Sequence, residues 1–187
     1  MDETTKVIIA TLSGFIIAFF AEPVKNYFAD RAKLHNLRVA LYTELINNYY
    51  ALTHFTLHGT DADSYTLFHV PKYELRMECY KHAIQNELSL YYQLKEANVL
   101  NIIYVRINQL MNLSSDLPAI YGKRGMKSIP SIFTQHSNTF KYMFTTSFSH
   151  RTFDARILRK LVTPEQFKEV MEKGKEYIEQ DAKNEEQ

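Results

Sequence analysis

The chain divides by hydrophobic pattern into one uninterrupted apolar run near the N-terminus and a much longer amphipathic remainder. The run, residues 7–21, contains fifteen consecutive residues without a charge. After it, apolar residues recur at three- and four-residue steps, which is the spacing of helices that pack one face on a core. The two patterns predict an all-α protein with a transmembrane segment over residues 1–23, a compact cytosolic helical bundle over residues 24–180 and a polar tail over residues 181–187.

The apolar run is long enough to span a membrane only together with its flanks. A helix of that length covers about 22 Å, whereas a hydrocarbon core is about 30 Å thick and takes about 20 residues. Residues 4–6 and 22–23 supply the difference, with their one lysine snorkelling outward. A secretory signal needs a basic start, but two of the first three residues are acidic, and cleavage after Ala21 puts bulky Phe19 at the minus-three position. An uncleaved signal and a buried core helix remain the alternatives.

Basic residues near the run predict its orientation. Lys6 precedes the run, and four basic residues follow it closely: Lys25, Arg31, Lys33 and Arg38. Because basic residues favour the cytoplasmic side of a membrane, we expect the N-terminus outside and the helical domain in the cytoplasm. The single cysteine, Cys79, agrees with a reducing compartment because it offers no internal disulfide.

Small residues form a row on one face of the predicted span. Ala10, Gly14 and Ala18 recur every four residues, and Ser13 lies beside them. Such a row lets the backbones of neighbouring helices approach closely in lipid, so it predicts self-association through this face. The alternative is the general abundance of small residues in membrane helices.

The first cytosolic helix is predicted to end near His58, because Gly59–Asp63 breaks the pattern. Its apolar stripe is formed by Leu34, Leu37, Leu41, Leu45, Tyr49 and Leu52. Further helices are expected over residues 72–97 and 99–113, as one or two segments. A long loop containing proline and glycine is expected over residues 114–130.

The C-terminal third is partly ambiguous. Residues 131–162 are rich in Thr and Ser, which favour strands or loops, yet they carry phenylalanines at helical spacing: Phe133, Phe140, Phe144 and Phe148. The last helix is predicted to start after Thr163, an N-cap residue followed by proline, glutamate and the capping-box residue Gln166. Its apolar stripe consists of Phe167, Val170, Met171 and Ile178.

Motifs of the common enzyme classes are absent from the sequence. It contains no phosphate loop, no GxSxG, no CxxC and no HExxH. His54 and His58 are four residues apart and could share a helix face, but no third metal ligand stands near them. We therefore expect no metal, no cofactor and no small-molecule substrate, and we predict that the protein is not an enzyme.

One segment resembles HEPN domains, all-helical modules that often cleave RNA as dimers without a metal. Arg76 and His82 fit the R-x4-6-H pattern of that family. The resemblance implies an HEPN-like helical bundle in which the arginine counters phosphate charge and the histidine transfers a proton, at a site shared by two protomers. The alternative is structural: a solvated or ion-paired Arg76 and a packed His82.

The chain as a whole resembles the small membrane accessory proteins of type VI-B CRISPR–Cas loci, because an N-terminal span precedes a helical domain with an R-x4-6-H pair. That resemblance implies a homo-oligomeric ring that forms or gates a pore, as an antiviral effector accompanying an RNA-guided, RNA-targeting nuclease. Thr11 and Ser13 are then the polar residues that face the lumen, and an apolar constriction can gate by dewetting. The implied partners are the lipid bilayer, further copies of the chain, and the nuclease complex or RNA.

Two basic patches could contact an anionic partner, although a formal net charge of +1 gives no overall attraction to nucleic acid. One patch contains Lys123, Arg124 and Lys127, and the other contains Arg151, Arg156, Arg159 and Lys160. RNA, a nucleotide messenger and anionic lipid headgroups fit such patches, and solvation of the surface is the alternative.

These features favour an oligomeric membrane effector without catalytic activity. A membrane-tethered HEPN-like ribonuclease acting through Arg76 and His82 is the first alternative. The second alternative is a single-span sensor whose cytosolic domain binds a nucleotide messenger and passes the signal to the membrane helix.

Overall fold

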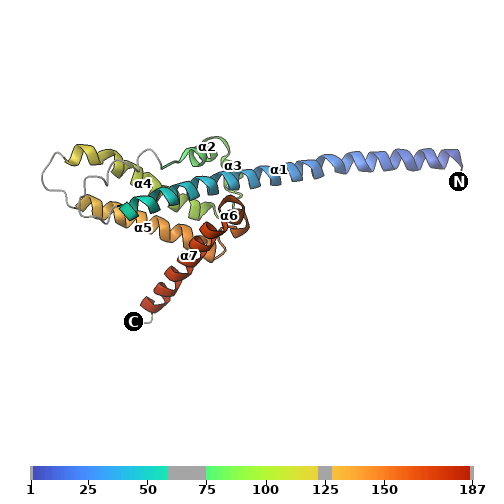
Figure 1. Cartoon of the computed structure of the whole chain (residues 1–187). Helices are drawn as coiled ribbons and strands as arrows, with labels where there is room; N and C mark the ends of the chain where they lie inside the picture. The colour runs from blue at the N-terminus through green and yellow to red at the C-terminus, as the bar shows by residue number, and fades with distance from the viewer. Residues whose placement is uncertain (1, 59–74, 122–127, 186–187) are drawn as a thin grey trace. The chain divides into compact units, whose positions relative to one another are not determined.

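The computed structural model describes residues 2–58, 75–121 and 128–185, and these residues form helices and turns without a strand (Figure 1). The all-α prediction is therefore confirmed for this part of the chain. Only the backbone is described at positions 5–10, 12, 13, 16–18, 54–58, 114–121, 128–131 and 185. The chain forms two compact units, Met1–Leu37 and Arg38–Gln187.

Helix α1 (Glu3–His58) supplies the first unit and the first helical segment of the second. In the second unit its predicted apolar stripe is confirmed, because Leu41, Leu45, Tyr49 and Leu52 are all buried. The helix is described as far as His58, and the predicted break over residues 59–63 lies outside the described residues.

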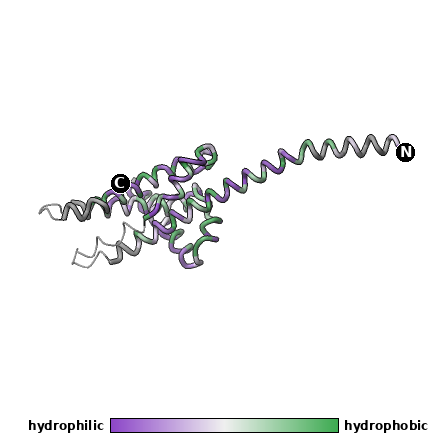
Figure 2. Tube along the Cα trace, turned by 90° about the horizontal axis from the view of Figure 1, so that it is seen from above, coloured by the Kyte–Doolittle hydropathy of each residue, from purple (hydrophilic) through white to green (hydrophobic). Residues whose placement is uncertain are grey.

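The first unit exposes every side chain from Phe19 to Lys33. Going along α1 from the N-terminus, Figure 2 shows hydrophobic positions that give way to mainly hydrophilic ones. Among the residues that the structure describes, no helix combines the length and the apolar character that a membrane crossing requires. Nine of the fifteen side chains in the apolar run, residues 7–21, lie outside the described part.

The prediction of a single helix over residues 72–97 is wrong over residues 75–97, the part of this segment that the structure describes. Two short helices, α2 (Glu78–Asn86) and α3 (Leu88–Tyr91), are separated by Glu87, whose backbone angles (φ −132°, ψ 32°) are not helical. Turns follow α3 as far as Glu96. Propensity alone does not mark this break, because Glu is a good helix former.

Side chains of α1 determine where α2 begins. The Glu44 carboxylate accepts hydrogen bonds from the backbone N–H groups of Cys79 (2.8 Å) and Tyr80 (3.2 Å). One turn further along α1, the Asn48 amide donates to the Arg76 carbonyl and accepts from the Arg76 N–H, both at 2.8 Å. Glu44 therefore caps α2 from a distant part of the sequence, where the first turn leaves N–H groups without helical partners.

The long loop predicted over residues 114–130 is wrong at both of its described ends. Helix α4 (Ala97–Tyr121) extends the predicted helix past Pro118, and helix α5 (Ser128–Ser149) begins before Pro130. Pro130 lies in the first turn of α5, where its missing N–H has no helical partner to lose. Pro118 lies in the last turn of α4.

The ambiguous segment from residue 131 is helical through Ser149. All four phenylalanines at helical spacing are buried: Phe133, Phe140, Phe144 and Phe148. The hydroxyl groups of Thr145 and Thr146 donate to the carbonyls four residues earlier (2.9 and 2.7 Å), so these residues fit a helix without exposing or isolating their polar groups. The Tyr49 ring of α1 stacks on Phe144 with the ring centroids 5.0 Å apart, which joins α5 to α1.

Two further helices, α6 (Ala155–Leu161) and α7 (Pro164–Glu185), complete the second unit. The predicted capping box is confirmed: the Thr163 N–H donates to the Gln166 side-chain oxygen (3.0 Å), and the Gln166 N–H donates to the Thr163 hydroxyl (3.3 Å). The predicted tail over residues 181–187 is helical as far as α7 extends.

Helix α5 packs against both α4 and α7 (Figure 1). The approach to α7 is closest at Gly174. A Cβ atom at that position would lie 2.5 Å from the Thr145 carbonyl oxygen and 2.3 Å from the Ser149 hydroxyl oxygen. The packing therefore needs a glycine there.

Candidate functional site

Large apolar side chains of the first unit are exposed on α1. Their exposed fractions lie between 50% and 69%, and they are Phe15, Phe19, Phe20, Val24, Tyr27 and Phe28. The Arg31 guanidinium lies over the Tyr27 ring, 4.9 Å from its centroid. Burying one such apolar side chain contributes roughly 1.5–3 kcal/mol, so this surface gains considerably from any apolar environment that covers it.

The predicted association face lies on the same part of α1. Thr11 and Gly14 are exposed, and a Cβ atom at Gly14 would meet nothing within 4 Å. The side chains of Ala10, Ser13 and Ala18 lie outside the described residues. The single chain thus leaves room beside Gly14, and self-association through this face stays a prediction.

A buried carboxylate connects α1 with the turn before α4. Glu96 is only 3% exposed, and both of its oxygens accept hydrogen bonds from the Arg38 guanidinium, the longer one at 3.2 Å. The Tyr42 hydroxyl donates to Glu96 (3.0 Å) and accepts from the backbone N–H of Asp154 (3.1 Å). Burial, and then the charge of Glu96, raise the pKa of Tyr42 well above its usual range, so the hydroxyl keeps the proton that it donates.

A second ion pair lies at the start of α6. Asp154 is the N-cap of that helix, and its carboxylate accepts hydrogen bonds from the backbone N–H of Arg156 (3.0 Å) and from the Arg156 guanidinium (3.0 and 2.8 Å). These bonds, most of all those from the guanidinium, lower the pKa of the Asp154 carboxyl. Asp154 is therefore an anion at neutral pH, and its charge is already compensated.

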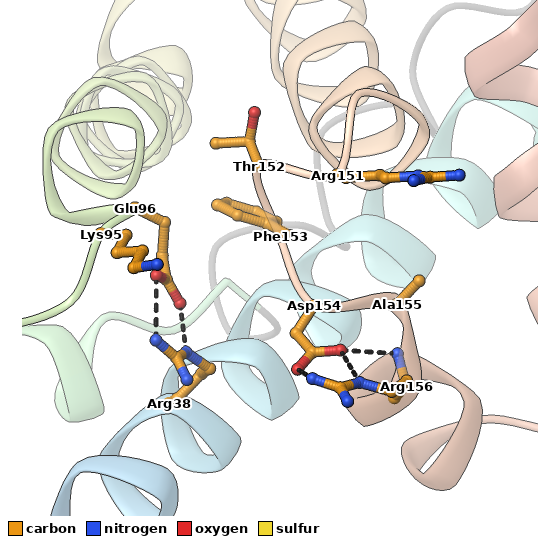
Figure 3. Close-up of a pocket in the computed structure, with 9 residues that line it drawn as sticks. All are labelled: Arg38, Lys95, Glu96, Arg151, Thr152, Phe153, Asp154, Ala155 and Arg156. Atoms are coloured by element: carbon orange, nitrogen blue, oxygen red, sulfur yellow. Dashed lines mark hydrogen bonds and ion pairs between the residues drawn. The ribbon is translucent and has the colours of Figure 1, made fainter.

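A cavity of about 500 Å³ is lined by both ion pairs (Figure 3). Its other lining residues are Lys95, Arg151, Thr152, Phe153 and Ala155. Figure 3 shows the Arg38 guanidinium turned toward Glu96 and that of Arg156 turned toward Asp154. Four cations and two carboxylates line the cavity, which leaves an excess of two positive charges. Such a site attracts anions.

The second predicted basic patch is divided by the structure. Arg151 and Arg156 line the cavity, whereas Arg159 and Lys160 do not; Arg159 lies 5.8 Å from the centroid of the Phe167 ring. The first basic patch, residues 123, 124 and 127, lies outside the described residues.

Sequence reasoning missed the cavity, because half of its charged lining comes from other parts of the chain. Arg38 counted only as a charge that orients the predicted span, and Lys95 and Glu96 carried no signal. Asp154 could have been identified, since an aspartate before an alanine and an arginine at the start of an apolar helical pattern is typical of an N-cap.

The structure does not place Arg76 and His82 in one site. Both side chains are exposed, and Arg76 precedes α2, whereas His82 lies within it. Arg76 lines a cavity of about 520 Å³ together with Glu44 and Glu78, and His82 is not part of that lining. A catalytic pair would therefore have to form between two copies of the chain.

Among the described residues, no group of three or more histidine, cysteine, aspartate or glutamate side chains could hold a metal ion. The side chains of His54 and His58 lie outside those residues. Comparisons with protein-family models, with characterised proteins and with solved structures gave no match to this chain.

Proposed function

We propose that the protein works at a membrane, with the N-terminal part of α1 inserted in a bacterial inner membrane and the unit Arg38–Gln187 on its cytoplasmic side. The observation that carries this proposal is the set of exposed aromatic side chains on α1, among them Phe15, Phe19 and Phe28. In water each of these rings forgoes the free energy of burial, and a bilayer supplies it without a protein partner.

The residues that follow the apolar run support insertion to a defined depth. Tyr27 and Phe28 are exposed at 53% and 63%, and the Arg31 guanidinium lies over the Tyr27 ring. Aromatic and basic side chains together are typical of the membrane–water interface on the cytoplasmic side. The apolar run therefore lies on the lipid side of Tyr27, and Arg31 and Lys33 lie on the water side.

The proposal includes self-association of the inserted helices through the face that contains Gly14. The open space beside Gly14 supports it, because a neighbouring helix can approach the backbone there. In the form that the resemblance to type VI-B accessory proteins suggests, the assembly is a ring that forms or gates a pore in antiviral defence, and the protein has no catalytic activity.

Two experiments test the proposal. Flotation with phosphatidylglycerol-containing vesicles should recover the full chain, and a variant lacking residues 1–22 should stay in the aqueous fraction. The mass of the detergent-solubilised particle should fall for Gly14→Leu but not for Gly14→Ala, because only leucine is too large for close helix approach. Equal flotation of the shortened chain would contradict insertion, and an unchanged mass for Gly14→Leu would contradict association through this face.

The sensor alternative is favoured by one observation, the cation excess in the cavity beside Arg38. Because Arg38 belongs to α1, a ligand in that cavity contacts the helix that also carries the membrane segment.

The ribonuclease alternative requires Arg76 and His82 to act together, so the Arg76→Ala and His82→Ala variants should each abolish RNA cleavage if it is correct.

A further inference from the structure

The carboxylates of the 500 Å³ cavity are already compensated, whereas two of its cations are not. Glu96 is paired with Arg38, and Asp154 is paired with Arg156. Within the described part of the chain, the side chains of Lys95 and Arg151 form no salt bridge or hydrogen bond. The two excess charges of the cavity are thus carried by side chains that can bind a ligand without breaking an existing contact.

Arg151 has an unusual backbone for a non-glycine residue. It lies two residues after the end of α5 and has a φ of 60°, in the left-handed region, where its N–H donates to the Phe148 carbonyl (3.1 Å). Glycine is the common residue at this position after a helix, because a side chain there costs about 1 kcal/mol. An arginine at this position lowers the stability of the fold relative to glycine, so stability does not explain the residue. A role of its side chain in binding would explain it.

The chemistry of the lining selects the class of ligand. Guanidinium groups donate in pairs to the oxygens of phosphate, and an ammonium group adds a point charge. A divalent cation is disfavoured, because both carboxylates are occupied and the net charge is positive. The Phe153 ring is 1% exposed and cannot stack on a base, so recognition is directed at the phosphate group itself.

We propose that this cavity binds a phosphate group, held by Lys95, Arg151 and the outward side of Arg156, next to the Arg38–Glu96 pair of α1. Arg156 can contribute because its side chain is 89% exposed while it pairs with Asp154. Arg151 extends away from both ion pairs in Figure 3, so its guanidinium must turn toward the ligand by rotation about its side-chain bonds. Inorganic phosphate, a soluble phosphate ester and the headgroup of phosphatidic acid share this chemistry.

Binding is measured by calorimetric titration of the full chain in neutral detergent at 0.15 M chloride, with pyrophosphate in one arm and short-chain phosphatidic acid in the other. The variants are Lys95→Ala and Arg151→Gly, and the matched control is Lys175→Ala, an exposed lysine of α7 that does not line the cavity. Each cavity variant should weaken binding about tenfold, because it removes one charge-assisted contact. The control should bind as the wild-type chain does.

Arg151→Gly separates binding from folding. Its thermal midpoint should equal or exceed that of the wild-type chain, because glycine relieves the left-handed backbone, and binding should still fall. A purely structural role for Arg151 predicts the opposite results: a lower thermal midpoint in the variant and no specific loss of affinity.

The two arms distinguish the source of the phosphate. Binding of pyrophosphate supports a soluble ligand, and binding of phosphatidic acid alone supports a lipid headgroup. Two results would overturn the proposal: no binding of either probe to the wild-type chain, or unchanged affinity in both Lys95→Ala and Arg151→Gly.

Discussion

Arg38 of α1 and Glu96, which are 58 residues apart in the sequence, form an ion pair in which the carboxylate is buried and the guanidinium is partly exposed. The pair fixes the first residue of the second unit to the turn before α4. Tyr42 extends the contact to the turn before α6 through its hydroxyl group. This network therefore aligns three segments around the charged cavity.

Replacement of Glu96 by Ala should destabilise the second unit by about 3 kcal/mol, because it leaves a partly buried guanidinium and a buried tyrosine hydroxyl without their acceptor. The measurement is urea unfolding of the full chain in neutral detergent. Glu172→Ala is the matched control, since Glu172 is 60% exposed and pairs with Lys168 on the surface of α7. The control should change stability by less than about 1 kcal/mol. Equal effects of the two substitutions would show that the Glu96 network does not stabilise the fold.

Replacement of Asn48 should lower the stability of the fold far more than replacement of its neighbour Asn47. Asn48→Ala removes both hydrogen bonds to the Arg76 backbone and should cost about 2 kcal/mol. Asn47 is exposed, so Asn47→Ala should cost no more than about 0.5 kcal/mol. Amide hydrogen exchange gives a local readout: the Arg76 N–H should lose protection in Asn48→Ala only. Retained protection of the Arg76 N–H in Asn48→Ala would contradict its hydrogen bond to the Asn48 side chain.

Two glycine-to-alanine substitutions should have opposite effects. Gly174→Ala should destabilise the packing of α7 on α5 by about 1–3 kcal/mol, because the new Cβ meets the Thr145 carbonyl oxygen at 2.5 Å. Gly14→Ala should have no destabilising effect and can favour helix by up to about 1 kcal/mol, because nothing lies within 4 Å of the new atom. Thermal unfolding of both variants checks this, and a neutral Gly174→Ala would show that the two helices pack less closely.

The thiol of Cys79 should titrate above its ordinary range. Burial, and then the negative charge of Glu44, raise its pKa, whereas an unfolded chain should show a value near 8.5. Because the chain has one cysteine, the pH profile of its alkylation by iodoacetamide reports this group alone. The midpoint of this profile should be higher in the native protein than in urea, because it follows the pKa of the thiol. Restricted access to the thiol lowers the alkylation rate at every pH but does not move the midpoint. A native midpoint at or below the unfolded one would contradict the placement of Cys79 beside Glu44.

The sequence predicts best those elements whose apolar spacing and end signals agree. The stripe of α1 and the Thr163–Gln166 capping box are of this kind, and both are confirmed. Prediction from the sequence fails where a long-range contact determines the start or the end of a helix. The start of α2 is capped by Glu44, 35 residues earlier in the chain, and no local signal shows that. Pro118 and Pro130 predict a loop, but Pro130 fits the first turn of α5 and α4 continues past Pro118.

The cavity could be predicted only in part. Arg151 and Arg156 belong to a visible basic cluster, but Lys95 and Glu96 become part of the site only when the turn before α4 packs on α1. A buried glutamate looks like any surface glutamate in a sequence, because its burial depends on a partner such as Arg38 far along the chain.

The central claim, insertion of the N-terminal part of α1 in a bilayer, is tested most directly by comparing two exposed sites. Phe19 on α1 and Tyr92 after α3 are exposed at 66% and 59% in the single chain. In a Cys79→Ser background, a nitroxide spin label is attached at Phe19→Cys or at Tyr92→Cys in vesicle-reconstituted protein, and its collision rates with oxygen and with a water-soluble nickel complex are measured. We predict that the label at position 19 collides mainly with oxygen, as in a hydrocarbon environment, and that the label at position 92 collides mainly with the nickel complex. Equal, water-like accessibility at both positions would contradict insertion.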